Sequence, residues 1–273
     1  MALAPLNLNQ PTNLSWNCLG IRSELQDLKG LINVFNPVCI GLQETFLSSN
    51  NPLKLRGYNS VRKDTATVSN HSGGVCILTS NLYPSTPLPL HTSLQAVAVQ
   101  VHARTLVTVC SVYLPPHDVI SQQDIDTLVD QLPTPFILLG DFNGHSTLWG
   151  SDVTNSRGRQ IERFISNNCL CLLNNDEKKY FHEPTHTFHS LDLAICSPTL
   201  LPLLNFTVGK DICNSDHFPI IVSYADSGCA IQYPPRYLFQ RADWGNFMQL
   251  ADIAECMVST ADITEEYKMS LIV

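Results

Sequence analysis

No apolar run in the 273-residue sequence approaches the roughly 18 residues needed to cross a bilayer, which argues against a membrane protein. The first residues, MALAPLNLNQPTN, have neither the basic nor the apolar segment of a secretory signal peptide. We therefore expect a nuclear or cytoplasmic protein that is not secreted and has no membrane partner.

Paired CxxC spacing is absent, although the chain has 10 cysteines. Several of them lie inside apolar stretches such as VCIGL, GVCIL and LDLAIC. We expect these to be buried free thiols that behave as small hydrophobic residues.

Basic residues are few, since 16 Lys and Arg stand against 24 Asp and Glu, a formal net charge of −8. This acidity argues against a simple polyanion-binding protein. Any contact with a nucleic acid must come from local basic patches.

Short strand-like segments dominate the chain and alternate with amphipathic ones. Strands are expected at 13–17, 37–43, 74–79, 95–101, 106–113, 136–141, 191–196 and 218–224. Helices are expected at 23–35, 120–132 and 157–168, with Ser23 and Gln26 forming a capping box at the first. Both hairpin and crossover spacings occur, which predicts mixed sheets covered by helices.

The composition changes after Tyr224. The stretch ADSGCAIQYPPRY is typical of a linker, and DWGNFMQLADIAECM has the pattern of an amphipathic helix. We therefore predict a first domain over 1–224 and a linker with a helical tail over 225–273.

Polar side chains interrupt the ends of most predicted strands. They are Asn17, Glu44, Tyr113, Asp141 with Asn143, Asp192, and Asp216 with His217. Strand ends that point one way can converge on a shared cleft. Taken singly, each also has an ordinary interpretation, as a turn residue, a solvated charge, a packed ring or a structural hydrogen bond. Gly-Asp-x-Asn directly after the apolar run FILL is the strongest single signal.

Together these residues could support metal-assisted attack of water on a phosphodiester. Glu44 is a hard oxygen donor of the kind Mg²⁺ prefers, and Asn17 adds a neutral oxygen. Asp141 is the candidate to orient or deprotonate the water, and Asn143 to position the phosphate.

The remaining candidates would act on the phosphate and the leaving group. His217 would contact the phosphate or the water, oriented by a carboxylate on its other ring nitrogen, for which Asp192 is the best candidate. Tyr113 could hydrogen-bond the phosphate or assist the leaving oxygen.

The stretches SWNCLGIR, GLQET, VYLPP, LLGDFNGH, SLDLAI and SDHFPI occur in this order over about residues 16–220. This ordered set resembles the endonuclease/exonuclease/phosphatase superfamily. The resemblance implies an α/β fold, a four-layer sandwich of two packed mixed β-sheets flanked by helices.

WNCLGIR, GDFNGHSTLWG, NSRG and the PTH before SLDL are similar in particular to the apurinic-type endonuclease domain of jockey-like non-LTR retrotransposons (LINE elements). The tail with ADWGNF resembles the segment that connects this domain to a reverse transcriptase. On this resemblance a truncated or separately encoded copy is the expectation.

The resemblance implies a Mg²⁺-dependent endonuclease, with Mn²⁺ as the alternative ion. It would nick one strand of double-stranded DNA and leave a 3′-hydroxyl, from which a reverse transcriptase domain copies the element RNA. It places Asn17, Glu44 and Asp216 near the metal, Tyr113, Asp141 and Asn143 around the phosphate, and Asp192 behind His217.

Two other functions stay open. One is a superfamily phosphodiesterase or phosphatase that acts on another substrate, and the other is a decayed or domesticated copy that binds without catalysis. Leu19 departs from apurinic repair enzymes, which often have an acidic residue at this place, and this weakens a repair function.

Local basic residues provide the candidate DNA contacts. These are Arg157, Arg159, Lys178 and Lys179, and a scattered solvated surface is the alternative for each. The loop KKYFHEPTHTFH, residues 178–189, is a candidate to shape target choice.

Overall fold

A computed structural model describes residues 10–48, 50, 53–64, 73–175, 177, 179–183 and 186–225. All of them lie in one compact unit of the chain, Met1–Ile231. Of the predicted tail over 225–273, residues 226–273 fall outside the described residues, as does Lys178.

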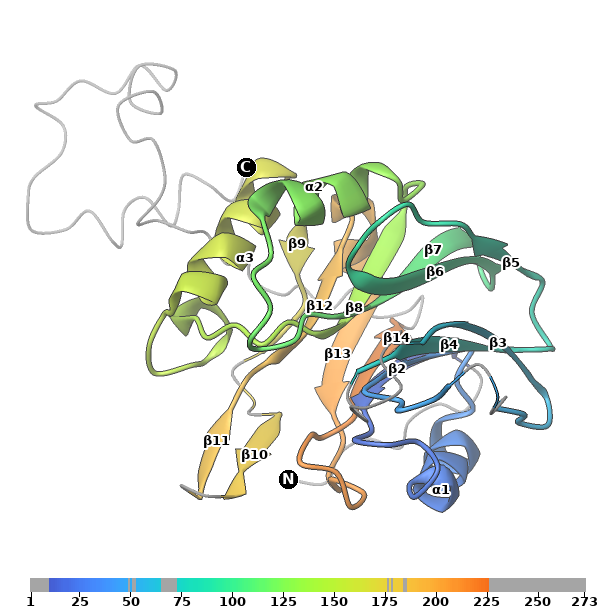
Figure 1. Cartoon of the computed structure of the whole chain (residues 1–273). Coiled ribbons are helices and arrows are strands. Elements are labelled where there is room, and N and C mark those ends of the chain that lie inside the picture. Colours follow the sequence, from blue (N-terminus) through green and yellow to red (C-terminus); the bar gives the residue numbers. More distant parts are fainter. Residues whose placement is uncertain are drawn as a thin grey trace, which may run out of the picture. The chain divides into compact units, whose positions relative to one another are not determined.

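Two mixed six-stranded sheets face each other (Figure 1). The first has the order β13 (Leu204–Val208), β14 (Ile220–Tyr224), β1 (Thr12–Asn17), β2 (Cys39–Gln43), β4 (Val75–Ser80) and β3 (Tyr58–Lys63). The second has the order β5 (Ser85–Leu88), β6 (Gln95–His102), β7 (Leu106–Tyr113), β8 (Phe136–Asp141), β12 (Asp192–Cys196) and β9 (Cys171–Leu172). A hairpin of β10 (Tyr180–His182) and β11 (Thr187–His189) projects beyond the second sheet.

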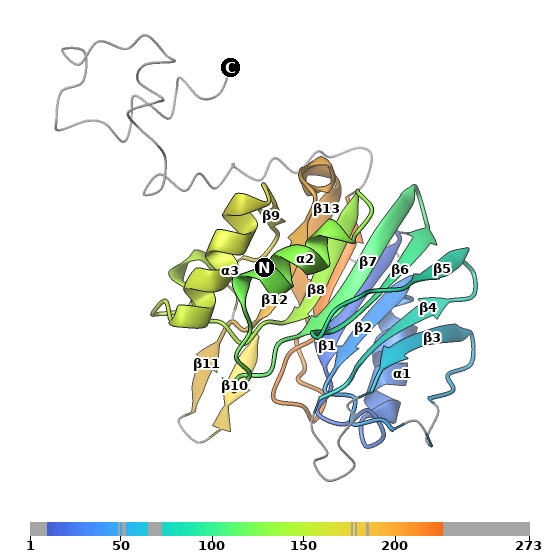
Figure 2. The ribbon, with the colours of Figure 1, turned by 45° about the horizontal axis from the view of Figure 1, so that its top comes forward.

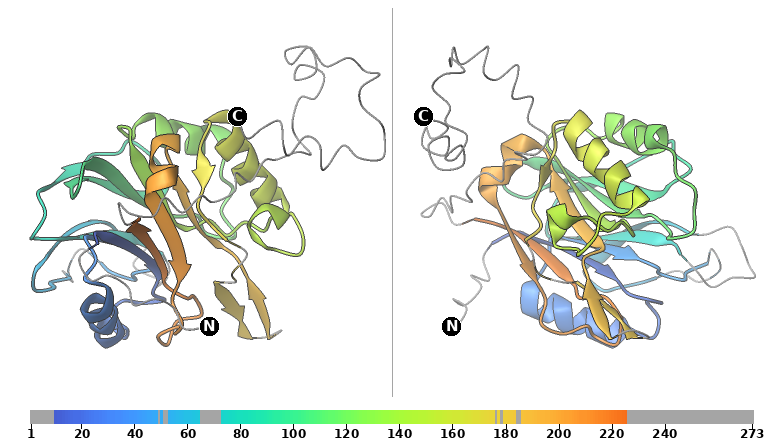
Figure 3. Two further views of the ribbon diagram at one scale, coloured as in Figure 1. Left: turned by 180° about the vertical axis from the view of Figure 1, so that it is seen from behind. Right: turned by 90° about the vertical axis from the view of Figure 1, so that its left-hand side faces the viewer.

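In the described part of the chain, three helices cover the outer faces of the two sheets. Figures 2 and 3 show α1 (Leu25–Phe35) against the first sheet and α2 (Gln122–Asp130) with α3 (Ser156–Asn167) against the second. Two 3-10 segments, η1 (Thr147–Trp149) and η3 (Pro198–Leu203), join strands and helices.

Separate apolar clusters fill the three spaces between these layers. One joins the facing sides of the sheets and contains Ile77, Val99 and Val222. The others pack α1 on the first sheet and α2 with α3 on the second. The predicted four-layer α/β sandwich is therefore confirmed.

All eight predicted strands are present, with ends that shift by at most two residues. Six further strands escaped prediction: β3, β5, β9, β10, β11 and β13. Most of them are short or lie at a sheet edge, and β3 and β5 have no buried side chain, so their sequences lack an apolar strand pattern.

The predicted capping box of the first helix is wrong. Helix α1 begins after Glu24, no side chain caps it, and Ser23 Oγ instead donates to Gly20 O at 2.8 Å. The Ser23 hydroxyl is therefore used in the local turn at Gly20, whose φ is +103°, and does not cap the helix. A capping box does occur in α2, between Ser121 and Asp124.

The eight cysteines in the described ranges are free thiols, as predicted. Five of them are buried, Cys171 and Cys213 are half-buried, and Cys169 is exposed. Over the same ranges, no helix is both long and apolar enough to cross a membrane.

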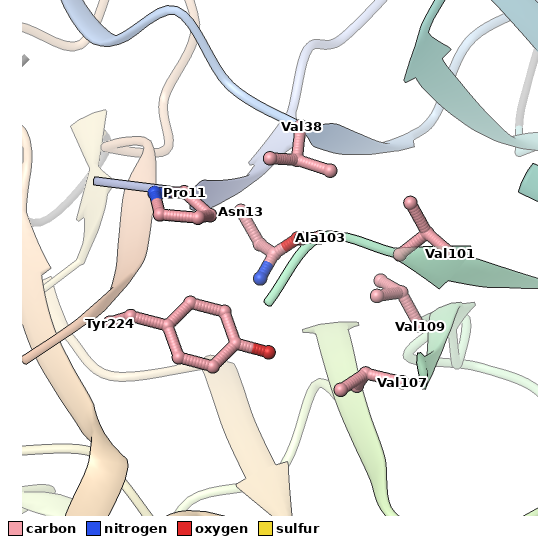
Figure 4. Close-up of a pocket in the computed structure, with 8 residues that line it drawn as sticks. All are labelled: Pro11, Asn13, Val38, Val101, Ala103, Val107, Val109 and Tyr224. Atoms are coloured by element: carbon pink, nitrogen blue, oxygen red, sulfur yellow. The ribbon is translucent and has the colours of Figure 1, made fainter. Parts of the chain in front are cut away.

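The two ends of the sandwich differ in chemistry. At the end where β1 and β7 start and β14 finishes, a small cavity is lined mainly by valines from both sheets (Figure 4). Asn13 and Tyr224 are the polar side chains there. The predicted site residues lie at the opposite end, where β1, β2, β7 and β8 finish.

Candidate active site

Strand direction brings the predicted residues to one edge of both sheets. In the first sheet, parallel strands β1 and β2 pair Asn17 with Gln43, one residue before Glu44. In the second sheet, Tyr113 pairs with Asp141 in parallel, and Asp141 pairs with Asp192 across an antiparallel ladder. The edge therefore collects polar side chains from both sheets at the ends of apolar strands.

Asn17 connects the two sheets at this edge. Its Nδ2 donates to Glu44 Oε1 at 2.9 Å and to Asp141 Oδ2 at 3.1 Å, while its Oδ1 accepts from Leu19 N at 3.3 Å. In this arrangement the amide orients two carboxylates and turns its oxygen towards the backbone. The structure thus places Asn17 between the predicted metal carboxylate and Asp141.

Asp141 is buried and accepts hydrogen bonds on both oxygens. Asn143 donates to it twice, from its backbone N to Oδ1 at 3.0 Å and from Nδ2 to Oδ2 at 2.9 Å. Asn143 has a φ of 49° and Glu44 a φ of 50°, in the left-handed region that non-glycine residues rarely adopt. Such strain is typical of functional turns, because the surrounding structure must hold it in place.

His217 lies in the loop before β14 and is buried in the site. Its Nδ1 is 2.7 Å from Asp192 Oδ2, which is the pairing predicted from the sequence. Its Nε2 is 3.9 Å from Asp141 Oδ2 and 3.8 Å from Asp216 Oδ1. The imidazole therefore stands among three carboxylates, and one of them fixes its orientation.

These surroundings shift the pKa of both central groups. Burial raises the pKa of Asp141 above its ordinary value, and the charge of His217 together with the Asn17 hydrogen bond offsets part of this rise. Burial alone would lower the pKa of His217, but the charge and hydrogen bond of Asp192, with Asp141 and Asp216, raise it to about 10. The imidazole is therefore a cation at neutral pH.

Tyr113 lies beside these groups at the end of β7. Burial and the charge of Glu44, to which its hydroxyl is hydrogen-bonded, raise the pKa of Tyr113 far above its ordinary value. The phenol consequently stays protonated and donates its one O–H to the Glu44 carboxylate.

The oxygen donors at this edge fit a hard divalent cation. Asp216 Oδ1 is buried and accepts no hydrogen bond, and Glu44 provides a second carboxylate. In the described part of the chain, no three His, Cys, Asp or Glu side chains form a ready ligand group. An open site with one or two carboxylates, completed by water and substrate oxygens, is the arrangement that Mg²⁺ prefers.

Sequence reasoning missed several residues that support this edge. Trp16 Nε1 donates to His217 O at 3.1 Å, and Ser215 Oγ donates to Asn17 O at 2.7 Å while accepting from His217 N. Trp16 lies in SWNCLGIR directly before Asn17, and Ser215 lies in NSDHFPI two residues before His217. The only sequence signal for either residue is therefore its place beside a predicted site residue. Tyr180 packs on His217 with ring centres 4.7 Å apart, and no pattern in the sequence indicates this contact.

The residues predicted to contact DNA, as far as the structure describes them, do not lie together at one surface, unlike the predicted site residues at the strand ends. Lys179 is fully buried, and its Nζ donates to Asn175 O, Glu177 O and Ser190 Oγ, so the prediction of a DNA contact there is wrong. Arg157 is half-buried and its terminal nitrogens donate to backbone carbonyls, so a phosphate contact of this residue stays a prediction. Arg159 is exposed and remains a candidate.

Solved structures of two endonucleases share the fold of this chain. The fold matches the endonuclease domain of TRAS1, a telomere-specific non-LTR retrotransposon, with a TM-score of 0.67, 21% identity, and coverage of 79% of this chain and 98% of that one. It also matches the AP endonuclease LMAP of Leishmania major, with a TM-score of 0.66, 14% identity, and coverage of 80% and 88%. The chain thus has the endonuclease/exonuclease/phosphatase fold.

The sequence is similar to proteins of non-LTR retrotransposons. Residues 107–221 match the family described as endonuclease-reverse transcriptase. The chain is 24% identical over 256 residues to the RNA-directed DNA polymerase from mobile element jockey of Drosophila melanogaster, covering 91% of this chain and 28% of that protein. It is 25% identical over 225 residues to the probable polymerase from transposon X-element of the same organism, covering 81% and 24%.

The resemblance to the endonuclease part of jockey-like non-LTR retrotransposon proteins is therefore confirmed. The chain spans about a quarter of the length of the curated relatives it matches.

Proposed function

We propose that this chain is a divalent-metal-dependent DNA endonuclease that hydrolyses one phosphodiester and leaves a 3′-hydroxyl. The observation that carries the proposal is the connected set at the strand ends. Glu44, Asn17 and Asp141 are joined by hydrogen bonds, and His217 lies 3.9 Å from Asp141.

In this mechanism each side chain has a defined task. Asp141, held by Asn17 and Asn143, orients the attacking water and accepts its proton, for which its raised pKa suits it. The His217 imidazolium donates a hydrogen bond to a phosphate oxygen and offsets the charge that builds there. When substrate is bound, the Tyr113 phenol turns its O–H from Glu44 to the leaving oxygen.

Glu44 and Asp216 would hold Mg²⁺, or Mn²⁺ as the alternative. When bound, the cation polarises a non-bridging oxygen of the phosphodiester and stabilises the charge of the transition state. Asn17 keeps the Glu44 carboxylate at a fixed distance from Asp141. The metal held by Glu44 and the water held by Asp141 would therefore keep fixed positions relative to the phosphate.

In an intact element, the nicked strand would prime reverse transcription of the element RNA by a polymerase domain. The polymerase names of the Drosophila relatives support this context. The substrate in this proposal is double-stranded DNA.

Nicking of supercoiled plasmid by the full chain with Mg²⁺ tests the proposal. We expect Glu44→Gln, Asp141→Asn and His217→Gln each to lower the nicking rate by about 10²-fold or more, since each removes a group that acts on the reacting atoms. Extension of the nicks by a DNA polymerase would report the 3′-hydroxyl.

Matched controls are Asp130→Asn and His102→Gln, which change exposed residues far from this edge. We expect wild-type nicking rates in these two controls and unchanged thermal unfolding in all five variants, which would assign the loss of nicking to the site and not to misfolding. Nicking that persists in the three site variants would contradict the proposal. DNA binding without nicking would instead support a non-catalytic binding module.

A further inference from the structure

The NSRG stretch, Asn155 to Gly158, begins α3 and has no part in the chemistry above. Asn155 caps the helix, because its Oδ1 accepts from Gly158 N at 2.7 Å. The same oxygen accepts from His145 N at 3.2 Å, and Asn155 N donates to His145 O at 3.0 Å. The start of α3 is thus bonded to the segment that directly follows Asn143.

Two glycines bring these segments into direct contact. A Cβ atom on Gly158 would lie 1.7 Å from His145 O, and one on Gly144 would lie 2.6 Å from Ile161 Cδ1. No side chain fits at either position without moving backbone or core. The first turn of α3 therefore packs directly on the turn after β8.

Arg157 extends from this turn to the loop after β7. Its two terminal nitrogens donate to four carbonyls: Leu114 O and Phe142 O at 3.5 Å, Pro115 O at 3.4 Å, and Asp118 O at 2.7 Å. Leu114 follows Tyr113, and Phe142 lies between Asp141 and Asn143. One rigid guanidinium therefore contacts the backbone beside each of the polar groups of β7 and β8.

The loop at 114–120 depends on α3 at both of its ends. Gln160 Nε2 donates to Ile120 O at 2.7 Å, while Arg157 holds the segment from Leu114 to Asp118. Between these points the loop is exposed, and Val119 is fully exposed. Leu114 and Ile120 also pack on the apolar cluster under α2 and α3, and the α3 side chains add the hydrogen bonds that hold the exposed segment between them.

We propose that Arg157 is a positioning residue that fixes Tyr113 relative to Asp141 and Asn143. As a catalytic statement this rests on the proposed endonuclease function. The guanidinium holds its N–H donors as a fork in one rigid plane and reaches carbonyls of two loops at once, whereas a lysine ammonium provides three donors from a single atom. We call the hydrogen bonds from Arg157 to these four carbonyls the clamp. Loss of the clamp lets the two strand ends move, and a shift of about 1 Å in a catalytic group costs about 10²-fold in rate.

Kinetics of Arg157→Met on nicking substrate, compared with Arg159→Met, separates positioning from DNA binding. We expect Arg157→Met to lower kcat by about 10²-fold with KM unchanged. Arg159→Met should raise KM and weaken its salt dependence, as removal of a phosphate contact does. Lys29→Met, on the exposed face of α1, controls for the lost charge.

A double-mutant cycle with Tyr113→Phe adds a readout that general destabilisation would not move. If Arg157 acts through Tyr113, the kcat effect of Arg157→Met becomes much smaller in the Tyr113→Phe background. An equal effect in both backgrounds, or a change confined to KM, would overturn the proposal. Arg157→Lys, which keeps the charge and loses the fork, should restore only part of kcat.

Amide hydrogen exchange tests the clamp without relying on nicking. In Arg157→Met we expect faster exchange over 113–120 and 142–146, with 192–196 in β12 unchanged. Unchanged exchange in the first two segments would overturn the clamp. A wild-type chain that shows this protection but nicks no DNA would refute the endonuclease function and leave the clamp standing.

Discussion

His217 is buried against Asp192, and this contact determines the charge on its ring. The ion pair and hydrogen bond outweigh the effect of burial and raise its pKa to about 10. The proton is therefore present at neutral pH and is lost only as the pH rises through that value. An imidazolium suits the stabilisation of a phosphate and does not suit a general base.

Titration of the His217 ring by NMR tests this assignment. We expect no titration of its signal between about pH 6 and 8, where an ordinary histidine changes charge. In Asp192→Asn the charge that raises the pKa of His217 most is gone, while burial still lowers it, so we expect this pKa to fall and the titration to move to lower pH. A His217→Gln variant identifies the signal. Titration of the wild-type signal near pH 6.5 would contradict the ion-pair account.

The residues that gather at this edge could be predicted from the sequence because polar side chains of this kind are unusual at the ends of apolar strands. The pairing of His217 with Asp192 followed from the need to orient an imidazole, and the two atoms lie 2.7 Å apart. Lys179 could not be predicted in the same way. Its buried position depends on carbonyls of Asn175 and Glu177 that only the folded loop brings together.

At the scale of elements, the buried strands were predictable and the polar or edge ones were not. β7 and β8 have the predicted limits because continuous apolar runs define both of their ends. β10 and β11 are three residues each, and they pair through Tyr180–His189, Phe181–Phe188 and His182–Thr187. A pattern this short cannot be told from a loop by alternation alone.

The β10–β11 hairpin divides its rings between two faces. Tyr180 packs on His217, and His189 contacts His145 with ring centres 5.0 Å apart. Phe181 and Phe188 pair with ring centres 4.9 Å apart, and Phe188 is exposed. One face therefore supports the site, and the other is available to a substrate outside it.

Exchange of residues 181–188 for another sequence of the same length, with Tyr180 and His189 kept, tests target choice. We expect the positions of nicks to change while the total nicking rate falls by less than about tenfold, since the contacts to His217 and His145 remain. Sequencing of nick sites on one plasmid would measure this. The same nick positions in both proteins would contradict a role of the hairpin in target choice.

At the scale of the whole molecule, the proposed site needs both sheets because each supplies part of the edge. Beneath the edge, Gln43 of the first sheet donates from Nε2 to Ser111 Oγ of the second at 2.8 Å, and Gln43 is fully buried. Such a satisfied polar bridge inside an apolar layer favours one register of the two sheets. The net charge of −8 opposes DNA binding, and at this edge the His217 proton and a bound divalent metal would offset most of the charge of its carboxylates.

Truncation of the chain after Ile231 tests the predicted boundary near 225. β14 ends at Tyr224, where Arg104 lies over the ring at 5.6 Å, and Ala225 N donates to Leu203 O at 2.8 Å. The three apolar clusters and every catalytic candidate lie before this point. We therefore expect the shortened chain to unfold cooperatively at the same temperature as the full chain and to nick plasmid at the same rate. A lower unfolding temperature or slower nicking would mean that residues beyond 231 belong to the functional fold, and the domain boundary would have to move towards the C-terminus.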